Sequence, residues 1–473
     1  MPSNDADAAE DEGSVLFDAS VDEGYQFYRI PSLLRVTAAA GTWLLAFCEG
    51  RQQLTDHGKV DIVLKRSADD GTTWSQLSVV HGEERRATIG NPTPLFDPDA
   101  SEVVLFFCRE NSEILSTRST DAGISWSLPR TIGWSRPPEW DWLATGPPAA
   151  LRLASGRYVL PCDGYLRLPG ARPGATRFYQ ASTVFSFVLL SDDRGATWRQ
   201  GPLLDGGNEC QAAALRNGSL LLNMRSRELR RLQAYSHDGG ETWSQPRPAQ
   251  PPVPDGNCQG SQISLGDGSL LVATSAGPGR IGLHAHLSTD GGGSWRRFAS
   301  PASRGAAYSA LVELPPPPLP PSESTARDAR VAAMCVHAWL AWLARAWLDR
   351  APPAPLAGLA ALLLLHALHT VLELAAQLLT SARPSGAPSA RVGLLYESSQ
   401  GGGSGATRAQ PGSRAATVLR YTTLVVPLQE PLPPAASLPP HPPPPAALPE
   451  GSRSPLSTRT ALLDHTCDRA RIS

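Results

Sequence analysis

Three arginines stand where short strands are expected to begin or end. Arg29 lies in the segment Tyr28-Arg29-Ile30-Pro31, Arg225 follows an apolar run at 220–224, and Arg280 follows the run 270–275 and a Gly-Pro-Gly turn. A planar guanidinium can hold a carboxylate with two hydrogen bonds and stays charged at any working pH. Each arginine alone could equally pair with a surface carboxylate. At matching places in a repeated fold, the three would form a site for an anionic ligand.

A repeated sequence pattern predicts the strands that would position these arginines. The eight-residue pattern Ser-x-Asp-x-Gly-x-(Thr/Ser)-Trp occurs five times, beginning at Ser67, Ser119, Ser191, Ser236 and Ser288. Apolar and often alternating runs between the copies, such as 60–64, 103–107 and 219–223, are typical of short strands. Each period therefore predicts about four strands, which is one blade of a β-propeller.

Within each copy, the Asp carboxylate can accept backbone N–H bonds across a tight turn, the Gly can adopt positive φ, and the Trp can fill the gap between sheets. Calcium binding or acid catalysis by these aspartates is the alternative. One carboxylate per turn in every copy favours the structural role.

Composition excludes some classes of binding partner and metal site. Lys+Arg 42 against Asp+Glu 44 gives a net charge of −2, so no overall field favours nucleic acid, and we expect no nucleic-acid partner. The seven cysteines show no CxxC or Cys/His spacing of a zinc site, which predicts buried, reduced thiols. The acidic start MPSNDADAAEDEG does not resemble a secretory signal, which predicts a cytoplasmic protein.

Together, the five repeats and Tyr-Arg-Ile-Pro resemble the sialidase (neuraminidase) family, closest to its animal cytosolic type. The resemblance covers about residues 14–312 and 392–427. It implies an all-β fold, a six-bladed β-propeller, and a carboxylate-binding triad formed by Arg29, Arg225 and Arg280. The implied ligand is a terminal sialic acid of a glycan.

The same resemblance implies the catalytic groups. Tyr308 matches the family's nucleophile, Glu209 its partner base, and Asp56 its acid/base. Because sialic acid carries a carboxylate on the anomeric carbon, a neutral phenol avoids the repulsion that an anionic nucleophile would meet. Asp56 lies in the polar, Gly-containing segment 49–58, which is expected to be mobile, and its pKa is expected to be raised.

Further residues match with less specific motifs. Four are expected to line the sugar site: Arg51, Asn91, Tyr165 and Gln259. Glu49 and Glu397 are expected to support it, with Glu397 orienting Arg29. The resemblance implies no metal and no organic cofactor, since the arginines supply the charge and side chains move the protons.

The segment 313–391 departs from the family pattern. It begins with polyproline and contains two apolar stretches, 331–350 and 356–380, that predict helices inserted in the last blade. A membrane hairpin, a soluble helical pair and translated non-coding sequence all remain open. Residues 1–13 and 428–473 are polar or Pro-rich, which predicts disorder.

The leading hypothesis is an exo-α-sialidase that acts with retention on glycoproteins, glycolipids or oligosaccharides, including ganglioside and oligosaccharide catabolism. A trans-sialidase, or a sialic-acid-binding propeller without activity if the insert displaces Tyr308 or Glu397, are the alternatives. We expect a monomer. Membrane association through 331–380 or through a glycolipid substrate is left open.

Overall fold

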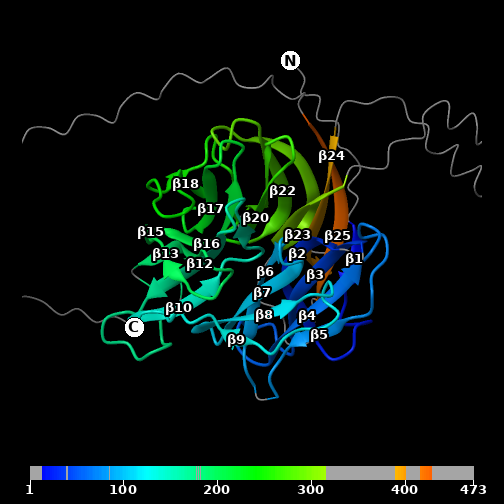
Figure 1. Ribbon diagram of the computed structural model, residues 1–473, viewed down its shortest axis with the longest axis horizontal. Coiled ribbons are helices and arrows are strands. Elements are labelled where there is room, and N and C mark those ends of the chain that lie inside the picture. The colour runs from blue at the N-terminus through cyan, green and yellow to red at the C-terminus, as the bar shows by residue number, and fades with distance from the viewer. Residues whose placement is uncertain are drawn as a thin grey trace, which may run out of the picture. The chain divides into compact units, whose positions relative to one another are not determined.

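The computed structural model describes residues 13–315, 389–400 and 416–428, apart from 39–40, 85, 177, 179, 182 and 278. These residues form an all-β propeller (Figure 1) and include no α-helix. Within them, accordingly, nothing helical is long and apolar enough to cross a membrane. The predicted helices at 331–350 and 356–380 lie outside the described residues, as do 1–12 and 429–473 of the predicted disordered ends.

The first four blades are separate antiparallel sheets. Blade 1 consists of β2 (Phe27–Ala38), β3 (Gly41–Arg51), β4 (Val60–Ser67) and β5 (Ser78–His81). Blade 2 consists of β6 (Ile89–Asp97), β7 (Glu102–Arg109), β8 (Glu113–Ser119) and β9 (Arg130–Thr131). Blade 3 consists of β10 (Trp140–Thr145), β12 (Tyr158–Leu166), β13 (Val184–Ser191) and β14 (Arg199–Gln200), with the short β11 (Leu151–Arg152) and β15 (Leu204–Asp205). Blade 4 consists of β16 (Gly207–Ala214), β17 (Leu220–Ser226), β18 (Leu232–Ser236) and β19 (Arg247–Pro248).

Blades 5 and 6 are joined through one long strand. Their strands are β20 (Gly260–Ser264), β21 (Leu270–Gly277), β22 (Ile281–Ser288), β23 (Arg296–Leu314), β24 (Ser389–Gln400), β25 (Ala416–Pro427) and β1 (Ser14–Phe17). The first part of β23 pairs with β22 as the outer strand of blade 5, and its second part pairs with β24 as the first strand of blade 6. The N-terminal β1 pairs with β25 and closes the ring. Both β23 and β24 reach slightly into the predicted 313–391 insert.

Each of the five repeats, the Asp boxes, forms the turn between the third and the outer strand of blades 1 to 5. In all five the Ser hydroxyl lies 2.8 Å from the Asp carboxylate. In the first copy, Asp69 also accepts the Thr73 backbone N–H at 2.8 Å. These carboxylates are thus used within their own turns, as the structural interpretation predicts. In blade 6 the third and outer strands come from opposite ends of the chain, so no such turn exists there.

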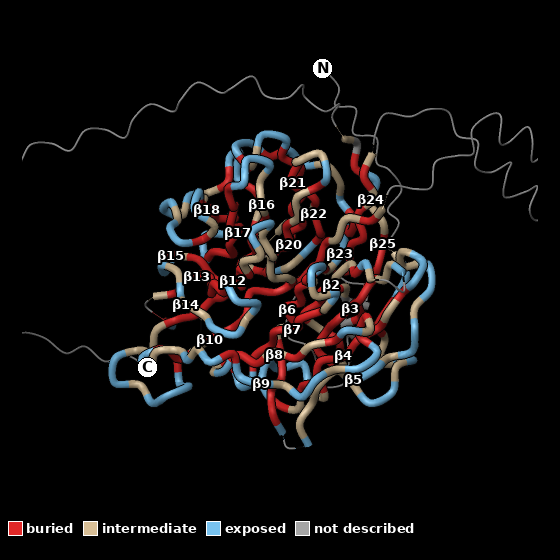
Figure 2. Tube along the Cα trace, viewed as in Figure 1, coloured by how far each residue is buried: buried red, intermediate tan, exposed pale blue. Residues whose placement is uncertain are grey.

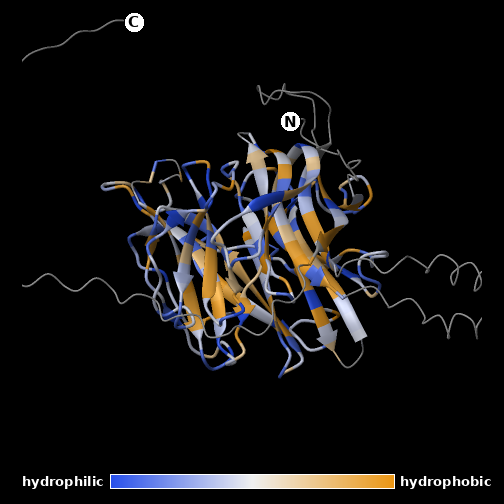
Figure 3. Cartoon of the chain, turned by 90° about the horizontal axis from the view of Figure 1, so that it is seen from above, coloured by the Kyte–Doolittle hydropathy of each residue, from blue (hydrophilic) through white to orange (hydrophobic). Residues whose placement is uncertain are grey.

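The core lies between the blades. Six buried apolar clusters each join two neighbouring sheets around the ring. Asp-box tryptophans contribute to them: Trp126 packs edge-on against Phe47 of the preceding blade at 5.9 Å. The buried residues follow the strands (Figure 2), and apolar residues are concentrated on the same strands (Figure 3). This packing fixes the relative positions of strand ends that lie far apart in sequence.

Candidate active site

A cavity of about 610 Å³ is lined by side chains from all six blades. All the residues predicted for the site line it except Gln259 and Glu397. The fold therefore brings together positions that span most of the chain, from Arg29 to Tyr308.

Irregularities in the first strands of several blades turn residues toward this cavity. The ladder shifts register between Arg29 and Ser32 in β2, between Gly90 and Thr93 in β6, and around Glu209 and Tyr308 in β16 and β23. Ile30 and Asn91, inside the first two shifts, have φ of 55° and 59°. Positive φ is unfavourable for a β-branched residue such as Ile30, and strain of this kind gathers at functional sites.

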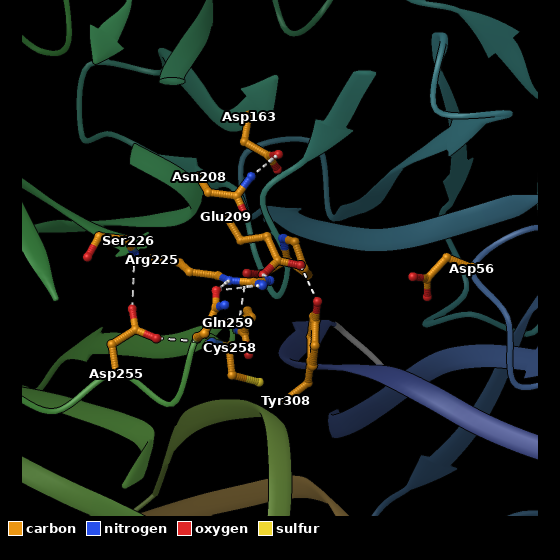
Figure 4. Close-up of polar contacts among 12 residues, drawn as sticks. Asp56, Asp163, Asn208, Glu209, Arg225, Ser226, Asp255, Cys258, Gln259 and Tyr308 are labelled. Atoms are coloured by element: carbon orange, nitrogen blue, oxygen red, sulfur yellow. Dashed lines mark hydrogen bonds and ion pairs between the residues drawn. The ribbon is translucent and has the colours of Figure 1, made fainter. Parts of the chain in front are cut away.

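Tyr308, Glu209 and Arg225 form a connected group at the cavity wall. The Tyr308 hydroxyl donates a short hydrogen bond to Glu209 Oε1, and Arg225 Nη1 lies 2.7 Å from Glu209 Oε2 (Figure 4). Burial raises the pKa of Tyr308 well above its usual range, and the Glu209 carboxylate raises it further. Tyr308 is thus a neutral phenol whose proton already points at a carboxylate.

The other two arginines lie against the same tyrosine. The guanidinium carbons of Arg29 and Arg280 are 5.2 and 5.4 Å from the centroid of the Tyr308 ring. Arg225 is held in addition by Asn257, whose Oδ1 accepts from its Nε and Nη2 at 3.1 and 2.9 Å. Three cations therefore converge on the phenol, and the arrangement can hold an anion next to its hydroxyl group.

Glu397 does not line the cavity but holds Arg29 in position. Its Oε1 lies 3.3 Å from Arg29 Nε and accepts the Ile30 backbone N–H at 2.8 Å. One buried carboxylate therefore fixes both the guanidinium and the strained backbone beside it. Both Glu397 and Tyr308 are in place at the site although the long insert separates them in sequence.

Glu49 and Arg51 connect the first two blades. Glu49 Oε2 accepts from Arg51 Nε at 2.7 Å, and Glu49 Oε1 accepts from the Asn91 backbone N–H at 2.7 Å. Both Glu49 and Arg51 are buried in the cavity wall. Asn91 and Arg51 still present atoms to the cavity.

Asp56 differs from its prediction. Its Oδ1 lies 3.2 Å from Arg29 Nη1 and 3.0 Å from Arg51 Nη1, while its side chain is 64% exposed. Partial burial favours a higher pKa, but the two guanidinium groups outweigh it and lower the pKa of Asp56. The expected raised pKa was wrong, because the sequence placed Asp56 in a loop but could not show its arginine partners.

Gln259 lies beneath the cavity and does not line it, which corrects its prediction as a sugar-lining residue. It is 1% exposed and exchanges two hydrogen bonds of 3.0 Å with the backbone of Ser309, the neighbour of Tyr308. Its Nε2 also donates to Pro147 O at 3.2 Å. Gln259 therefore fixes the backbone that carries the phenol.

Several lining residues were missed by the sequence. Asp163 is buried, accepts from Asn208 Nδ2 at 2.7 Å, and has its pKa raised by burial and by nearby Glu209. The ring centroid of Phe178 lies 5.1 Å from the guanidinium carbon of Arg225. Trp142 stacks on Tyr165 at 5.8 Å. Of these residues, only Asn208 could have been found from the sequence, because it is adjacent to Glu209. Asp163, Phe178 and Trp142 belong to no repeated or recognisable motif.

Among the described residues, five cysteines are buried and unpaired: Cys48, Cys108, Cys162, Cys210 and Cys258. Cys335 and Cys467 lie outside the described ranges. No group of three or more His, Cys, Asp or Glu side chains suited to a metal ion occurs in the part of the chain that is described.

The chain is similar to known proteins in sequence and in fold. The BNR repeat-like domain family matches residues 41–316. Human sialidase-4 is 32% identical over 299 residues, which cover 53% of this chain and 60% of that protein. Mouse sialidase-2 is 31% identical over 273 residues, which cover 51% of this chain and 69% of that protein. The chain thus spans less than two thirds of sialidase-4.

Among solved structures, the Hadza microbial sialidase Hz136 superposes with a TM-score of 0.53 at 22% identity, covering 61% of each chain. The NanB sialidase of Streptococcus pneumoniae superposes with a TM-score of 0.52 at 17% identity, covering 64% of this chain and 66% of that one. Similarity at this level shows a shared propeller fold.

Proposed function

Because this chain belongs to the sialidase family, we propose that it is an exo-α-sialidase that releases terminal sialic acid from glycans with retention of configuration. The observation that carries the proposal is the Tyr308–Glu209 hydrogen bond with three guanidinium groups around the phenol. A site of this kind pairs a nucleophile, its base and an anion-binding group in one cavity.

Substrate binding rests on charge. The sialic acid carboxylate would lie between Arg29, Arg225 and Arg280. Glu397 orients Arg29, Glu209 and the Asn257 side chain orient Arg225, and the Asn257 backbone oxygen accepts from Arg280 Nη2 at 3.5 Å. Preorganised guanidinium groups lose little freedom when the ligand binds, so the interaction favours binding and fixes the anomeric carbon near Tyr308. This is the step that makes a neutral nucleophile advantageous.

The first chemical step transfers the sugar to the protein. Glu209 takes the Tyr308 proton, the phenolate oxygen forms a bond with the anomeric carbon, and the glycosidic C–O bond breaks. The leaving oxygen takes a proton from Asp56. In the second step Asp56 removes a proton from water, the water oxygen attacks the anomeric carbon, and Tyr308 leaves and recovers its proton from Glu209. Two inversions give retention.

The test compares wild type with Tyr308→Phe on a fluorogenic aryl sialoside and on sialyllactose. We expect wild type to release sialic acid and Tyr308→Phe to lose turnover while its thermal unfolding stays cooperative. Full activity in Tyr308→Phe would remove the phenol from its role as nucleophile. A folded wild type that binds sialic acid without hydrolysing either substrate would refute the enzyme assignment.

Asp56→Asn should affect the hydrolysis of substrates with sugar and aryl leaving groups to different extents. General acid catalysis contributes ~10²–10⁴ in rate, so sialyllactose hydrolysis should fall by about that factor. An aryl leaving group needs little protonation, so hydrolysis of the aryl sialoside should fall much less. Product analysis with excess lactose in the same assay tests for sialyl transfer.

A further inference from the structure

Asp56 contacts one of the three arginines of the anion site. Its carboxylate lies on Arg29 Nη1 at 3.2 Å, while Glu397 lies on Arg29 Nε at 3.3 Å. The Arg29 side chain is only 12% exposed. Asp56 therefore contacts Nη1, one of the two terminal nitrogens of Arg29, whereas Glu397 contacts Nε.

The substrate would need the same nitrogen. A guanidinium holds a carboxylate through two N–H groups on one edge, and Glu397 already occupies the side of Nε. A second carboxylate beside Asp56 on Nη1 would place two negative charges in contact, which is unfavourable. The substrate carboxylate and Asp56 therefore compete for Arg29.

Arg51 provides a way for Asp56 to leave Arg29 without leaving the site. Its Nη1 donates to Leu54 O at 3.3 Å and to Thr55 O at 3.1 Å, as well as to Asp56 at 3.0 Å. Its other side is fixed by Glu49, and its side chain is 4% exposed. The loop is therefore attached to a rigid cation that does not depend on Arg29.

We propose that Asp56 is an internal competitor for the substrate carboxylate, displaced from Arg29 when the substrate binds and kept at the cavity by Arg51. The proposal rests on the proposed function, since it assigns Asp56 as the acid and Arg29 as a carboxylate ligand. It deepens that function by linking the position of the acid to occupancy of the anion site.

The exchange also changes the protonation that Asp56 favours. The charged groups that act on it are Arg29 from β2, Arg51 from β3 and His57 beside it in the loop. Two further carboxylates contact these arginines, Glu49 on Arg51 and Glu397 on Arg29. Losing Arg29 and gaining a substrate carboxylate nearby both favour the protonated carboxyl. The acid would thus take up a proton from solvent when the site is filled, which is the form needed to protonate the leaving oxygen.

The test measures binding of free N-acetylneuraminic acid and of its methyl ester by calorimetry to wild type and Asp56→Asn. Removing the competing charge should tighten binding of the free acid by about two- to fivefold, the range expected for release of one partly exposed ion pair. Because the ester has no carboxylate to exchange, its affinity should stay the same. Asp99→Asn is the matched control, because Asp99 is 58% exposed and pairs with Arg152 away from the cavity.

The outcomes separate this proposal from the one it rests on. Failure of wild type to bind the free acid would overturn the proposed function itself. Binding and hydrolysis by wild type, with unchanged or weaker binding of the free acid to Asp56→Asn, would overturn only the exchange. Asp56→Ala should tighten binding in the same direction, which excludes an effect special to the new amide, and thermal unfolding confirms that each variant folds.

Discussion

Arg225→Lys tests whether the anion site depends on a guanidinium rather than on positive charge. Arg225 uses Nη1 for Glu209 at 2.7 Å, and both Nε and Nη2 for Asn257 at 3.1 and 2.9 Å. Its side chain is 8% exposed and lies against Phe178. A lysine has one nitrogen at the end of its chain, so it can reach Glu209 or Asn257 but cannot also hold a carboxylate with two parallel hydrogen bonds.

The expected loss of binding free energy follows from the number of hydrogen bonds that lysine cannot make. A hydrogen bond to a charged group contributes about 1.5–3 kcal/mol, and at least one such bond to the substrate carboxylate disappears. This corresponds to about a 10- to 150-fold increase in the Ki of free sialic acid and in KM. The kcat should change less, because Tyr308 donates to Glu209 Oε1, whereas Arg225 contacts the other carboxylate oxygen, Oε2.

The assay measures kcat and KM on the fluorogenic sialoside and Ki for sialic acid, with thermal unfolding as a check on the fold. Arg152→Lys is the matched control: Arg152 is 14% exposed and pairs with Asp97 and Asp99 outside the cavity. It should leave KM and Ki unchanged. A Ki for Arg225→Lys within threefold of wild type, in a stable protein, would refute the argument that geometry governs the site.

Two other predictions concern stability and thiol reactivity. Desolvation favours a higher pKa for Asp121, but hydrogen bonds from Ser125 outweigh it and lower the pKa from 3.8 to about 2. The ionised Asp121 therefore stabilises the fold above about pH 4, and this contribution is lost as the pH falls toward 2. Asp121→Asn should therefore flatten the decline of unfolding free energy between pH 4 and pH 2 measured with urea, and an unchanged slope would contradict the assignment. Burial raises the pKa of all five described thiols, so at most two of the seven cysteines should react with a thiol reagent before unfolding and all seven after it. Rapid native reaction of more than two would contradict their burial.

The sequence predicted best what is determined locally. The hydrogen bonds among the Ser, Asp, Gly, Thr and Trp positions of the first Asp box lie within eight residues, from Ser67 to Trp74, so the pattern of residue types is enough to form the turn. Five such turns with strands between them are enough to indicate a propeller. Their places at strand ends made the three arginines candidates, and the family resemblance identified them as a triad.

Contacts between distant segments were not predictable in the same way. Gln259 is buried because Ser309 and Pro147, 50 and 112 residues away, supply its partners. Asp56 has a lowered pKa because β2 and β3 bring Arg29 and Arg51 to it. A sequence shows that a carboxyl lies in a polar loop, but the sign of its pKa shift depends on charges that only the folded sheets place nearby.

The long insert illustrates why the site tolerates a departure from the family pattern. Tyr308 and Glu397 lie at one end of the β23–β24 pair, where Ser309 is opposite Tyr396, and the chain leaves the pair at its other end, where Leu314 is opposite Arg391. Six residues of strand place that exit about 20 Å from Tyr308 along the sheet. Lengthening a connection adds a closure cost that grows only slowly with length, and the ladder between β23 and β24 fixes Glu397 independently of what the connection contains. Arg29 therefore keeps its supporting carboxylate because strand register, rather than the length of the intervening segment, determines where Glu397 lies.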